Sequence, residues 1–477
     1  MPTIMIEIPS ELKELGEAVR LLVALTEQQQ ALARAPGGRP MDYQEYERAV
    51  GASAAAVERA SHQAVLQALD IDQPAVEIEG QRYTQVGRYE ANYYTLAGPV
   101  PVWRSLYRSD AERNGPTVDA VSLRAGVVGP GWLPATARAM AHAVQQQPSR
   151  EAEQHAAELG RLPYSRTAFE EVTHRVGERF VARHASVEEA LIRGYQAPAE
   201  TVSLSVSLDR GSLPMVEPRK RPVGRPRKDA PKEPKARVFH MAYCGTVTLH
   251  DAAGEALHTL RYGCMPKSGG DDLCIGLAGD VAELLRRHPA LHVVLLCDGA
   301  QEMWNLLDEH LNLETLGVTV HRLVDLWHLL EKLGHAAGVL QEDAEACSAL
   351  LRRWRLRLLN ASSAATEILA ELQGSGREQQ QVGKSRPVHE AITYLQNHAG
   401  MFDYAAARRL GLPIGSGNVE ATVKSLFEVR LKRPGSGWKE DTGEHIVQLR
   451  ALALSDRWGA AMDLTLQPLA KAVRAVA

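Results

Sequence analysis

An α/β fold built on a mixed sheet is predicted by the order of elements in the second half of the chain. Three runs rich in β-branched residues, between residues 202 and 264, read as consecutive antiparallel strands. Behind them come a helical pattern, a buried apolar strand, a short helix and a further strand. These four segments are expected at 270–289, 291–297, 303–311 and 318–325.

Three strands, helix, strand, helix, strand is the order of an RNase H-like core, a mixed sheet with helices on both faces. The strongly helical segment 327–410 then reads as an all-α insertion. A mainly helical N-terminal DNA-binding region is expected to precede this core.

The N-terminal region shows helical and strand patterns in turn. Apolar residues at three- and four-residue steps predict a helix over 10–35, and an Ala-rich helix is expected over 43–69. Residues 75–108 read as short strands. Ser165 is a plausible N-cap for the second of two helices separated by a tight break. This pair is either a DNA-reading helix-turn-helix or an ordinary αα-hairpin.

These patterns divide the chain into six predicted regions. They are helical 1–72, small α+β 73–148, helix-turn-helix-like 149–200, core first part 201–326, helical insertion 327–410 and core C-terminal part 411–477.

Composition sets limits on the class of protein. At 477 residues the chain is too long for one core, and 45% hydrophobic with 23% charged residues is ordinary for a globular protein. The net charge of -4 does not itself indicate a nucleic-acid binder, so basic residues must be clustered if DNA is the partner. Five cysteines without CxxC spacing, no visible signal peptide and no long apolar run fit a cytoplasmic, nucleoid-associated protein without a membrane span.

Three acidic residues lie where strand ends or helix starts are predicted. Asp209 and Asp298 each follow an apolar strand, and Glu420 opens a helix after the turn IGSGN. Carboxylate oxygens are the ligands that Mg²⁺ prefers, and two such ions support phosphodiester chemistry. Taken singly, each residue is more often a turn residue than a metal ligand. Their RNase H-like order favours a catalytic metal site made by all three.

Two further clusters are candidates for auxiliary roles. Asp325 ends a predicted strand and His328 lies three residues on, so the pair can either assist the metal site or be an N-cap with a packed histidine. Basic side chains that follow Glu420 can hold DNA phosphates or simply form a solvated helix face. They are Lys424, Arg430, Lys432 and Arg433.

The C-terminal run resembles the signature of bacterial insertion-sequence transposases of the ISKra-like branch. The resemblance covers about 200–455, and LLCDGAQEMW, LVDLWHLLEKL and VSLDRG resemble other motifs of that family, the second shared with Mutator-type transposases. The matched C-terminal positions are Pro413, Ile414, Gly415, Ser416, Gly417, Glu420, Lys424, Arg430, Lys432, Arg433, Gly435 and Trp438.

The resemblance implies a DDE transposase that cleaves DNA and transfers strands. It implies Asp209, Asp298 and Glu420 as catalytic metal ligands for two Mg²⁺ or Mn²⁺ ions, with Asp325 and His328 as auxiliary residues. Trp438 is implied as a further DNA-binding residue beside the basic side chains. The implied partners are the terminal inverted repeats of the element and target DNA, bound by a homodimer or higher oligomer. Two alternatives stay open: an RNase H-fold DNA nuclease or resolvase, and a non-catalytic domesticated DNA-binding protein.

A basic segment interrupts the predicted sheet at 217–237. It has nine Lys or Arg against three acids, and its five prolines predict an exposed loop. Within it, VGRPRK looks like an AT-hook whose Arg225, Arg227 and Lys228 would enter a narrow A·T-rich minor groove. The other interpretation is a solubilising basic linker.

Overall fold

A computed structural model describes residues 7–35, 37, 40–112, 114–216 and 237–476. The protein is mixed α/β with two five-stranded sheets. It divides into two compact units, one formed by residues 1–183 with 459–477 and the other by residues 184–458.

The first unit combines helices with an antiparallel sheet. Its strands are β1 (Ala75–Ile78), β2 (Gln81–Thr95), β3 (Gly98–Ser109), β4 (Thr117–Asp119) and β10 (Val473–Ala475). Its helices are α1 (Lys13–Ala33), α2 (Tyr43–Ala68), α3 (Ala120–Ala125), α4 (Pro134–Gln146), α5 (Ser149–Glu158), α6 (Arg166–Val181) and α19 (Trp458–Leu466), with the 3₁₀ turns η1 (Ser10–Leu12) and η3 (Gln467–Leu469).

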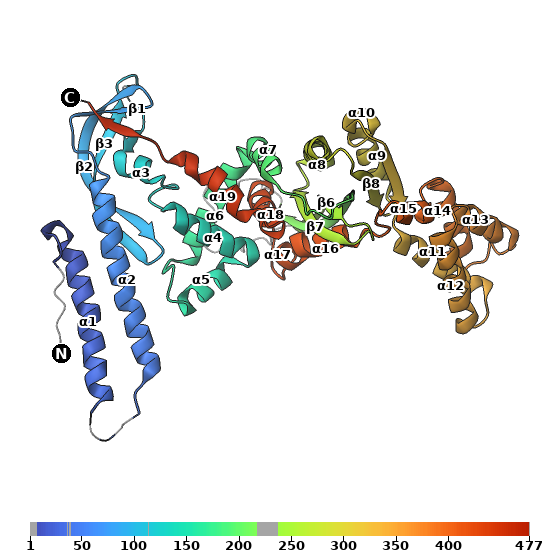
Figure 1. Ribbon diagram of the computed structural model, residues 1–477, viewed down its shortest axis with the longest axis horizontal. Helices are drawn as coiled ribbons and strands as arrows, with labels where there is room; N and C mark the ends of the chain where they lie inside the picture. Colours follow the sequence, from blue (N-terminus) through green and yellow to red (C-terminus); the bar gives the residue numbers. More distant parts are fainter. Residues whose placement is uncertain (1–6, 36, 38–39, 113, 217–236, 477) are drawn as a thin grey trace, which may run out of the picture. The chain divides into compact units, whose positions relative to one another are not determined.

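The sheet of this unit has the order β10-β1-β2-β3-β4. The predicted short strands of 75–108 are in fact dominated by one long hairpin, β2 with β3, which pair from Tyr83↔Ser109 to Thr95↔Gly98. The chain's end adds β10 beside β1, in the register Val76↔Ala475 (Figure 1). Residues 459–477 therefore belong to this unit, whereas the sequence pattern had placed 411–477 together in the core.

The second unit carries the other sheet and most of the helices. Its strands are β5 (Ser203–Val216), β6 (Arg237–His250), β7 (Ala256–Cys264), β8 (His292–Cys297) and β9 (Val320–Val324). Its helices are α7 (His184–Gly194), α8 (Gly269–Arg287), α9 (Gln301–His310), α10 (Leu313–Leu316), α11 (Leu326–Leu340), α12 (Ala344–Asn360), α13 (Ala364–Gly374), α14 (Pro387–Asn397), α15 (Tyr404–Arg409), α16 (Gly417–Thr422), the π-helical η2 (Val423–Glu428), α17 (Val429–Leu431) and α18 (Glu440–Leu454).

The strand order of this second sheet is β7-β6-β5-β8-β9. β5, β6 and β7 are antiparallel neighbours, while β8 is parallel to both β5 and β9. The predicted succession of three strands, helix, strand, helix and strand is thus what the structure has, with the short α10 added before β9.

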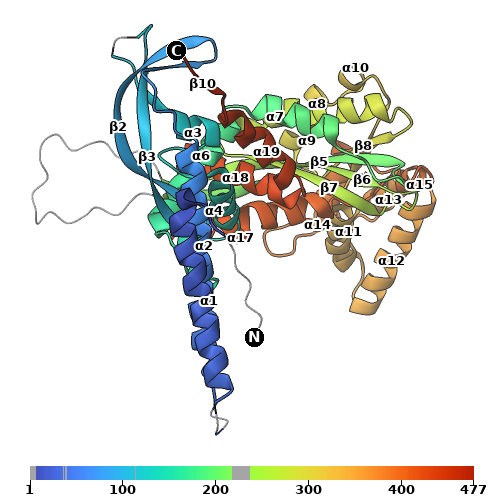
Figure 2. The ribbon, with the colours of Figure 1, turned by 60° about the vertical axis from the view of Figure 1, so that its left-hand side comes forward.

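Helices cover both faces of this sheet (Figure 2). A Cβ on Gly245 of β6 would lie 2.7 Å from Leu277 of α8, whereas a Cβ on Gly263 of β7 would lie 2.4 Å from Leu426 of η2 and 3.1 Å from Val447 of α18. Glycines at these two positions allow the helices to approach the strands closely. Gly263 pairs with Cys244, the residue next to Gly245 in β6. Because successive residues of a strand point to opposite faces, Gly245 and Gly263 lie on opposite faces of the sheet.

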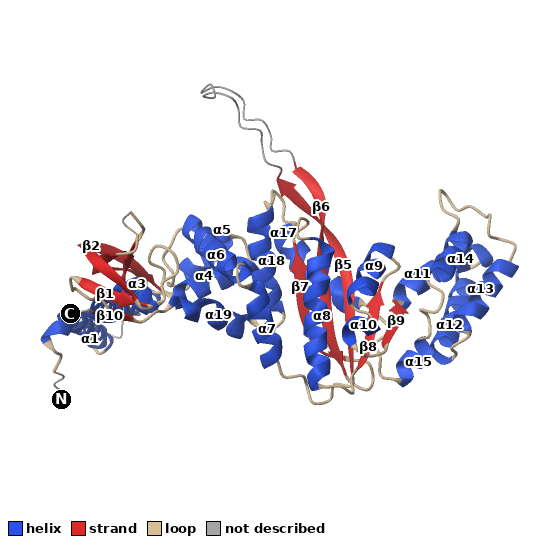
Figure 3. Cartoon of the chain, turned by 90° about the horizontal axis from the view of Figure 1, so that it is seen from above, coloured by secondary structure: helices blue, strands red, loops and turns tan. Residues whose placement is uncertain are grey.

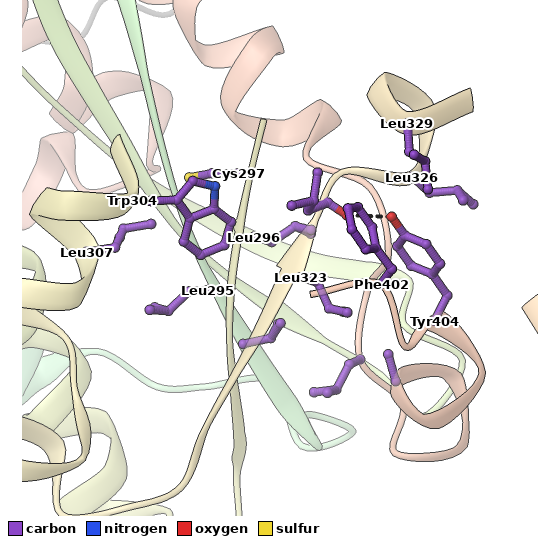
Figure 4. Packing of buried hydrophobic residues seen from close by; sticks show 14 of the residues in the cluster. Leu295, Leu296, Cys297, Trp304, Leu307, Leu323, Leu326, Leu329, Phe402 and Tyr404 are labelled. Carbon is purple, nitrogen blue, oxygen red and sulfur yellow. Dashed lines mark hydrogen bonds between the residues drawn. The ribbon is translucent and has the colours of Figure 1, made fainter. Parts of the chain in front are cut away.

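The helices α11–α15 gather beside the edge strand β9 (Figure 3). They share one apolar core with the sheet, in which Trp304 of α9 and Trp354 of α12 are both 1% exposed. Figure 4 shows this packing, including the hydrogen bond of 3.0 Å that the Tyr404 hydroxyl donates to the Val324 carbonyl. The predicted insertion is therefore helical, and its packing is continuous with that of the sheet.

A buried polar chain ties α7, α8 and β7 to the loop after α18. Arg457 donates to Glu188 at 2.6 Å and its guanidinium lies 4.9 Å from the Tyr262 ring centre. The Tyr262 hydroxyl donates to Asp280 Oδ2 at 2.6 Å. Burial, with the Glu188 charge adding to it, raises the pKa of Asp280 to about 7. Asp280 is therefore protonated in the folded protein at a pH where the unfolded chain has lost that proton.

The replacement Asp280→Asn tests this assignment. Because the folded pKa lies above the ordinary value near 3.8, the wild type loses stability as pH rises from about 4 to about 7. The Asn side chain still accepts a hydrogen bond from Tyr262 but cannot ionise. The melting temperature of the variant minus that of the wild type should therefore be a few degrees larger at pH 8 than at pH 4. Scanning calorimetry at both pH values measures this difference, and a difference independent of pH would refute the raised pKa.

Candidate active site

Three acidic residues share one row across the second sheet. β5 and β8 pair from Ser203↔His292 to Val206↔Leu295, and β8 and β9 pair from Val293↔Val320 to Cys297↔Val324. Continuing both registers by a few residues sets Asp209, Asp298 and Asp325 side by side. Neighbouring positions in one row of a sheet project to the same face, so these carboxylates face a common region.

Asp209 lies within β5 and not at its end. β5 continues to Val216, but its pairing with β8 stops at Val206, so at Asp209 the strand is paired only with β6, through Cys244. The predicted strand end was therefore wrong for β5 as a whole, although Asp209 does lie just past the parallel part of the sheet. Burial raises the pKa of Asp209, and the charges of Asp298 and Glu420 raise it further. These electrostatic effects indicate that the three predicted carboxylates lie near one another.

Asp298 is held in a tight turn between β8 and α9. Its Oδ1 accepts a hydrogen bond of 2.9 Å from the Ala300 amide, and its carbonyl accepts one of 2.8 Å from the Trp304 indole. A Cβ on Gly299 would lie 2.3 Å from the ring of Tyr394, which comes from α14. Close packing against the helical insertion therefore requires glycine at position 299, a reason that the sequence does not reveal.

Asp325 connects two segments that are distant in sequence. It is 1% exposed and caps α11 by accepting from the His328 amide at 2.9 Å. Its other oxygen accepts from the Ser416 amide at 2.5 Å and from the Ser416 hydroxyl at 3.0 Å. Burial opposes its ionisation, but the hydrogen bonds from His328 and Ser416 outweigh burial and lower the pKa of Asp325. The carboxylate thus fixes the turn from which the Glu420 helix starts.

His328 lies between the acidic residues. Its Nδ1 is 3.1 Å from Asp325 Oδ1 and 3.9 Å from Glu420 Oε1. The hydrogen bond to Asp325 raises the pKa of His328 to about 9, with the Asp298 and Glu420 charges adding to the shift. At neutral pH this histidine is therefore an imidazolium surrounded by carboxylates.

Glu420 belongs to the short helix α16, which runs directly into the π-helical segment η2. π-Helical turns are rare and often occur at functional sites. A Cβ on Gly211 of β5 would lie 2.9 Å from the ring of Phe427 in η2. Gly211 is two residues from Asp209 and so on the same face of β5, which means that η2 packs on the face that carries Asp209.

An ion pair missed by the sequence analysis lies next to this row. Glu302, in the first turn of α9, pairs with Arg210 and accepts a hydrogen bond of 2.5 Å from the Tyr243 hydroxyl. It thereby ties the helix after Asp298 to β5 and β6. The sequence shows only that Glu302 follows Asp298 by four residues, and it does not show that Glu302 contacts Arg210 and Tyr243.

The carboxylates are spread more widely than the ligands of one ion. Among the described residues, the group of three whose ligand atoms all lie within 4.8 Å of one another is Asp271, Glu309 and His310. That group is at the surface, where α8 begins and α9 ends. Asp209, Asp298 and Glu420 therefore form a looser acidic cluster, joined electrostatically through His328.

The predicted DNA-contacting residues fall into separate groups. Arg430 is 6% exposed and stacks over Trp438 at 5.2 Å, while the Trp438 amide donates to the Pro214 carbonyl at 2.9 Å. The Arg430 side chain is thus buried against Trp438, and the backbone of Trp438 lies beside the end of β5. Lys432 pairs with Glu428 at 3.0 Å, whereas Lys424 is exposed.

The remaining predicted DNA-contacting residues are Arg433 and the basic residues of the AT-hook-like segment. Arg433 donates to the Val429 carbonyl at 3.2 Å and so lies along its own helix. The AT-hook-like Arg225, Arg227 and Lys228 lie outside the described residues.

The two helices of the predicted helix-turn-helix are present as α5 and α6. Ser165 caps α6 as expected, accepting from the Ala168 amide at 3.4 Å. The exposed side of α6 carries Glu170, Glu171 and Glu178, and Arg175 there pairs with Glu171. Arg166 is also exposed on this helix, so its surface carries both signs of charge and no excess of basic residues for DNA phosphates to contact.

Comparison with known proteins adds little to this geometry. No known protein family matches the chain, and no curated protein matches its sequence. Among solved structures, the chain is similar to the "Mos1 transposase paired-end complex with left transposon end", at 14% identity and a TM-score of 0.16, over 85% of this chain and all of that one. A TM-score this low does not establish a common fold.

Within the described ranges, no helix combines the length and the apolar character that a membrane span requires.

The link between Asp325 and His328 gives a direct prediction. Because the Asp325 hydrogen bond is the largest cause of the raised pKa, Asp325→Asn should lower the pKa of His328 from about 9 towards its ordinary value near 6.5. Histidine ring NMR titration measures this, with the His328 signal assigned from its loss in His328→Gln.

Ser416→Ala is the matched control, since it removes a hydrogen bond to the other Asp325 oxygen and leaves the histidine contact in place. An unchanged His328 pKa in Asp325→Asn, or an equal fall in both variants, would contradict the assigned cause.

Proposed function

We propose that this protein is a DNA transposase of the DDE type, in which Asp209, Asp298 and Glu420 hold divalent metal ions for strand cleavage and strand transfer. The observation that supports this most is the convergence of acidic residues at the point where the parallel strands β5 and β8 separate. The strand order β7-β6-β5-β8-β9, antiparallel and then parallel, agrees with the order expected for an RNase H-like sheet and supports this point as the site of chemistry.

The donor set suits a hard divalent cation. All three side chains offer carboxylate oxygens, the ligands that Mg²⁺ and Mn²⁺ prefer. Burial raises the pKa of Asp209, repulsion from Asp298 and Glu420 raises it further, and a bound cation would relieve that repulsion. When bound, two such ions activate the attacking hydroxyl and stabilise the leaving oxygen in phosphodiester chemistry.

The remaining residues of the site act on charge and position. The His328 imidazolium offsets part of the acidic charge and can donate a hydrogen bond to a DNA phosphate that enters the site. Asp325 keeps that imidazolium protonated and anchors the turn before α16, so that Glu420 stays close to His328. In this scheme Asp325 is a positioning residue, because it is buried and acts through His328 and Ser416.

The full reaction of a transposase needs DNA ends and a target. The resemblance of residues 200–455 to ISKra-like transposases supports terminal inverted repeats as the bound DNA, and two ends would be brought together by a homodimer or higher oligomer. Water first attacks a phosphodiester at the end of the element, releasing a 3′-hydroxyl. That hydroxyl then attacks a phosphodiester of target DNA, so one P–O bond forms as another breaks.

Single replacements in the acidic cluster test this proposal. Asp209→Asn, Asp298→Asn and Glu420→Gln should each lower nicking of a duplex bearing the element's own ends by at least a hundredfold in Mg²⁺ and leave DNA binding intact. Asp271→Asn is the matched control, because it removes one carboxylate from the other acidic group of the same unit. Nicking gels and gel-shift titrations provide the two readouts.

The outcomes separate the competing functions. Full cleavage by Asp209→Asn would rule out the proposed site, and loss of cleavage in Asp271→Asn alone would move the site to α8. Cleavage by the wild type without joining of a labelled end to target DNA would indicate a nuclease or resolvase. DNA binding without cleavage in Mg²⁺ or Mn²⁺ would indicate a non-catalytic DNA-binding protein.

A further inference from the structure

The helix α12 carries a basic face that plays no part in the site described above. Its exposed side holds Arg352, Arg353 and Arg355, with Arg357 at one margin. At 100° per residue these four side chains cover an arc of roughly 200° around the helix, opposite the buried Trp354 and Leu358. The helix is therefore amphipathic, and its outer side carries these arginines with Leu356, which is 62% exposed, among them.

Arg355 and Arg357, at the two edges of this face, contact other side chains, whereas Arg352 and Arg353 lie between them. Arg357 pairs with Glu367 and Glu371 of α13. Within the described part of the chain, Arg352 and Arg353 form neither an ion pair nor a hydrogen bond. Glu371, the carboxylate whose pKa Arg353 helps to lower, is already shared by Arg357 and the Trp354 indole.

A shallow hollow follows the same stripe of the helix. It has a volume of about 590 Å³ and is lined along three turns of α12. The lining residues are Ala349, Arg352, Arg353, Leu356, Arg357, Asn360 and Ala361. The lining of this hollow is mostly apolar, so it is the exposed guanidinium groups of Arg352 and Arg353 beside it, with their forked donors, that suit the oxygens of a phosphate.

The other edge of the face reaches the acidic cluster. The Arg355 guanidinium lies 5.0 Å from the ring centre of Trp327, which is 57% exposed. A Cβ on Gly415 would lie 3.2 Å from the Trp327 ring and 3.6 Å from Asp325 Oδ2, so Trp327 borders the Asp325 anchor. Arginine side chains thus continue from the edge of the proposed active site along α12.

We propose that this face of α12 binds the phosphodiester backbone of the DNA on which the active site acts, with Arg352 and Arg353 as phosphate contacts. This inference rests on the proposed function. It supplies phosphate contacts that the buried Arg430, stacked on Trp438, does not make. Because phosphate contacts carry no sequence information, the face positions DNA and does not select a sequence.

The double variant Arg352→Gln/Arg353→Gln tests the inference in the full-length protein. Fluorescence anisotropy with a linear duplex of mixed sequence should show weaker binding, and the slope of log K against log salt should become shallower by about 2, since two phosphate contacts are lost. Arg193→Gln/Arg286→Gln is the matched control: it changes the net charge equally but removes arginines paired with Glu189 and Glu283.

The same preparations are assayed for nicking in Mg²⁺, so that the two proposals fail separately. A salt slope equal in the double variant, the control and the wild type overturns the α12 contact, even when nicking by the wild type confirms the active site. A shallower slope in the double variant alone supports the contact, even when the wild type does not nick DNA. A circular-dichroism melt of each variant shows that folding is retained.

Discussion

The buried carboxylate of Asp325 is the constraint on which the arrangement of the acidic cluster depends. It caps α11, binds the His328 side chain and accepts two hydrogen bonds from Ser416. An N-cap contributes about 1 kcal/mol, and leaving a buried donor without a partner costs about 1–3 kcal/mol. The larger consequence is positional, since one side chain joins the edge strand, the first helix of the insertion and the turn before Glu420.

The acidic row itself follows from strand register. Parallel pairing of β5, β8 and β9 brings Asp209, Asp298 and Asp325 into neighbouring positions, although they are far apart in the sequence. Packing of η2 on Gly211 adds Glu420 from the same face. The four carboxylates would repel one another strongly, and the His328 imidazolium, with the hydrogen bonds to Asp325, keeps part of that charge compensated.

Much of the second unit could be predicted because its signals are local. Alternating β-branched residues and the apolar runs before Asp298 and Asp325 each act within a few residues. The remainder depends on contacts between distant segments. The extent of β5 past Asp209, the pairing of β10 with β1 and the burial of Arg430 against Trp438 are decided by tertiary packing. The sequence does not reveal whether an arginine is exposed for a phosphate or buried against a tryptophan, so charge alone could not separate these roles.

The central claim is that the acidic cluster captures divalent cations. Crystals grown in Mn²⁺ and measured at an X-ray wavelength where manganese scatters anomalously would locate such ions directly. We expect an anomalous peak contacted by oxygens of Asp209 and Asp298, with Glu420 beside it or beside a second peak. The account would be contradicted if anomalous peaks were confined to Asp271, Glu309 and His310. It would also be contradicted if Mn²⁺ occupied other sites strongly and no peak lay beside the acidic row.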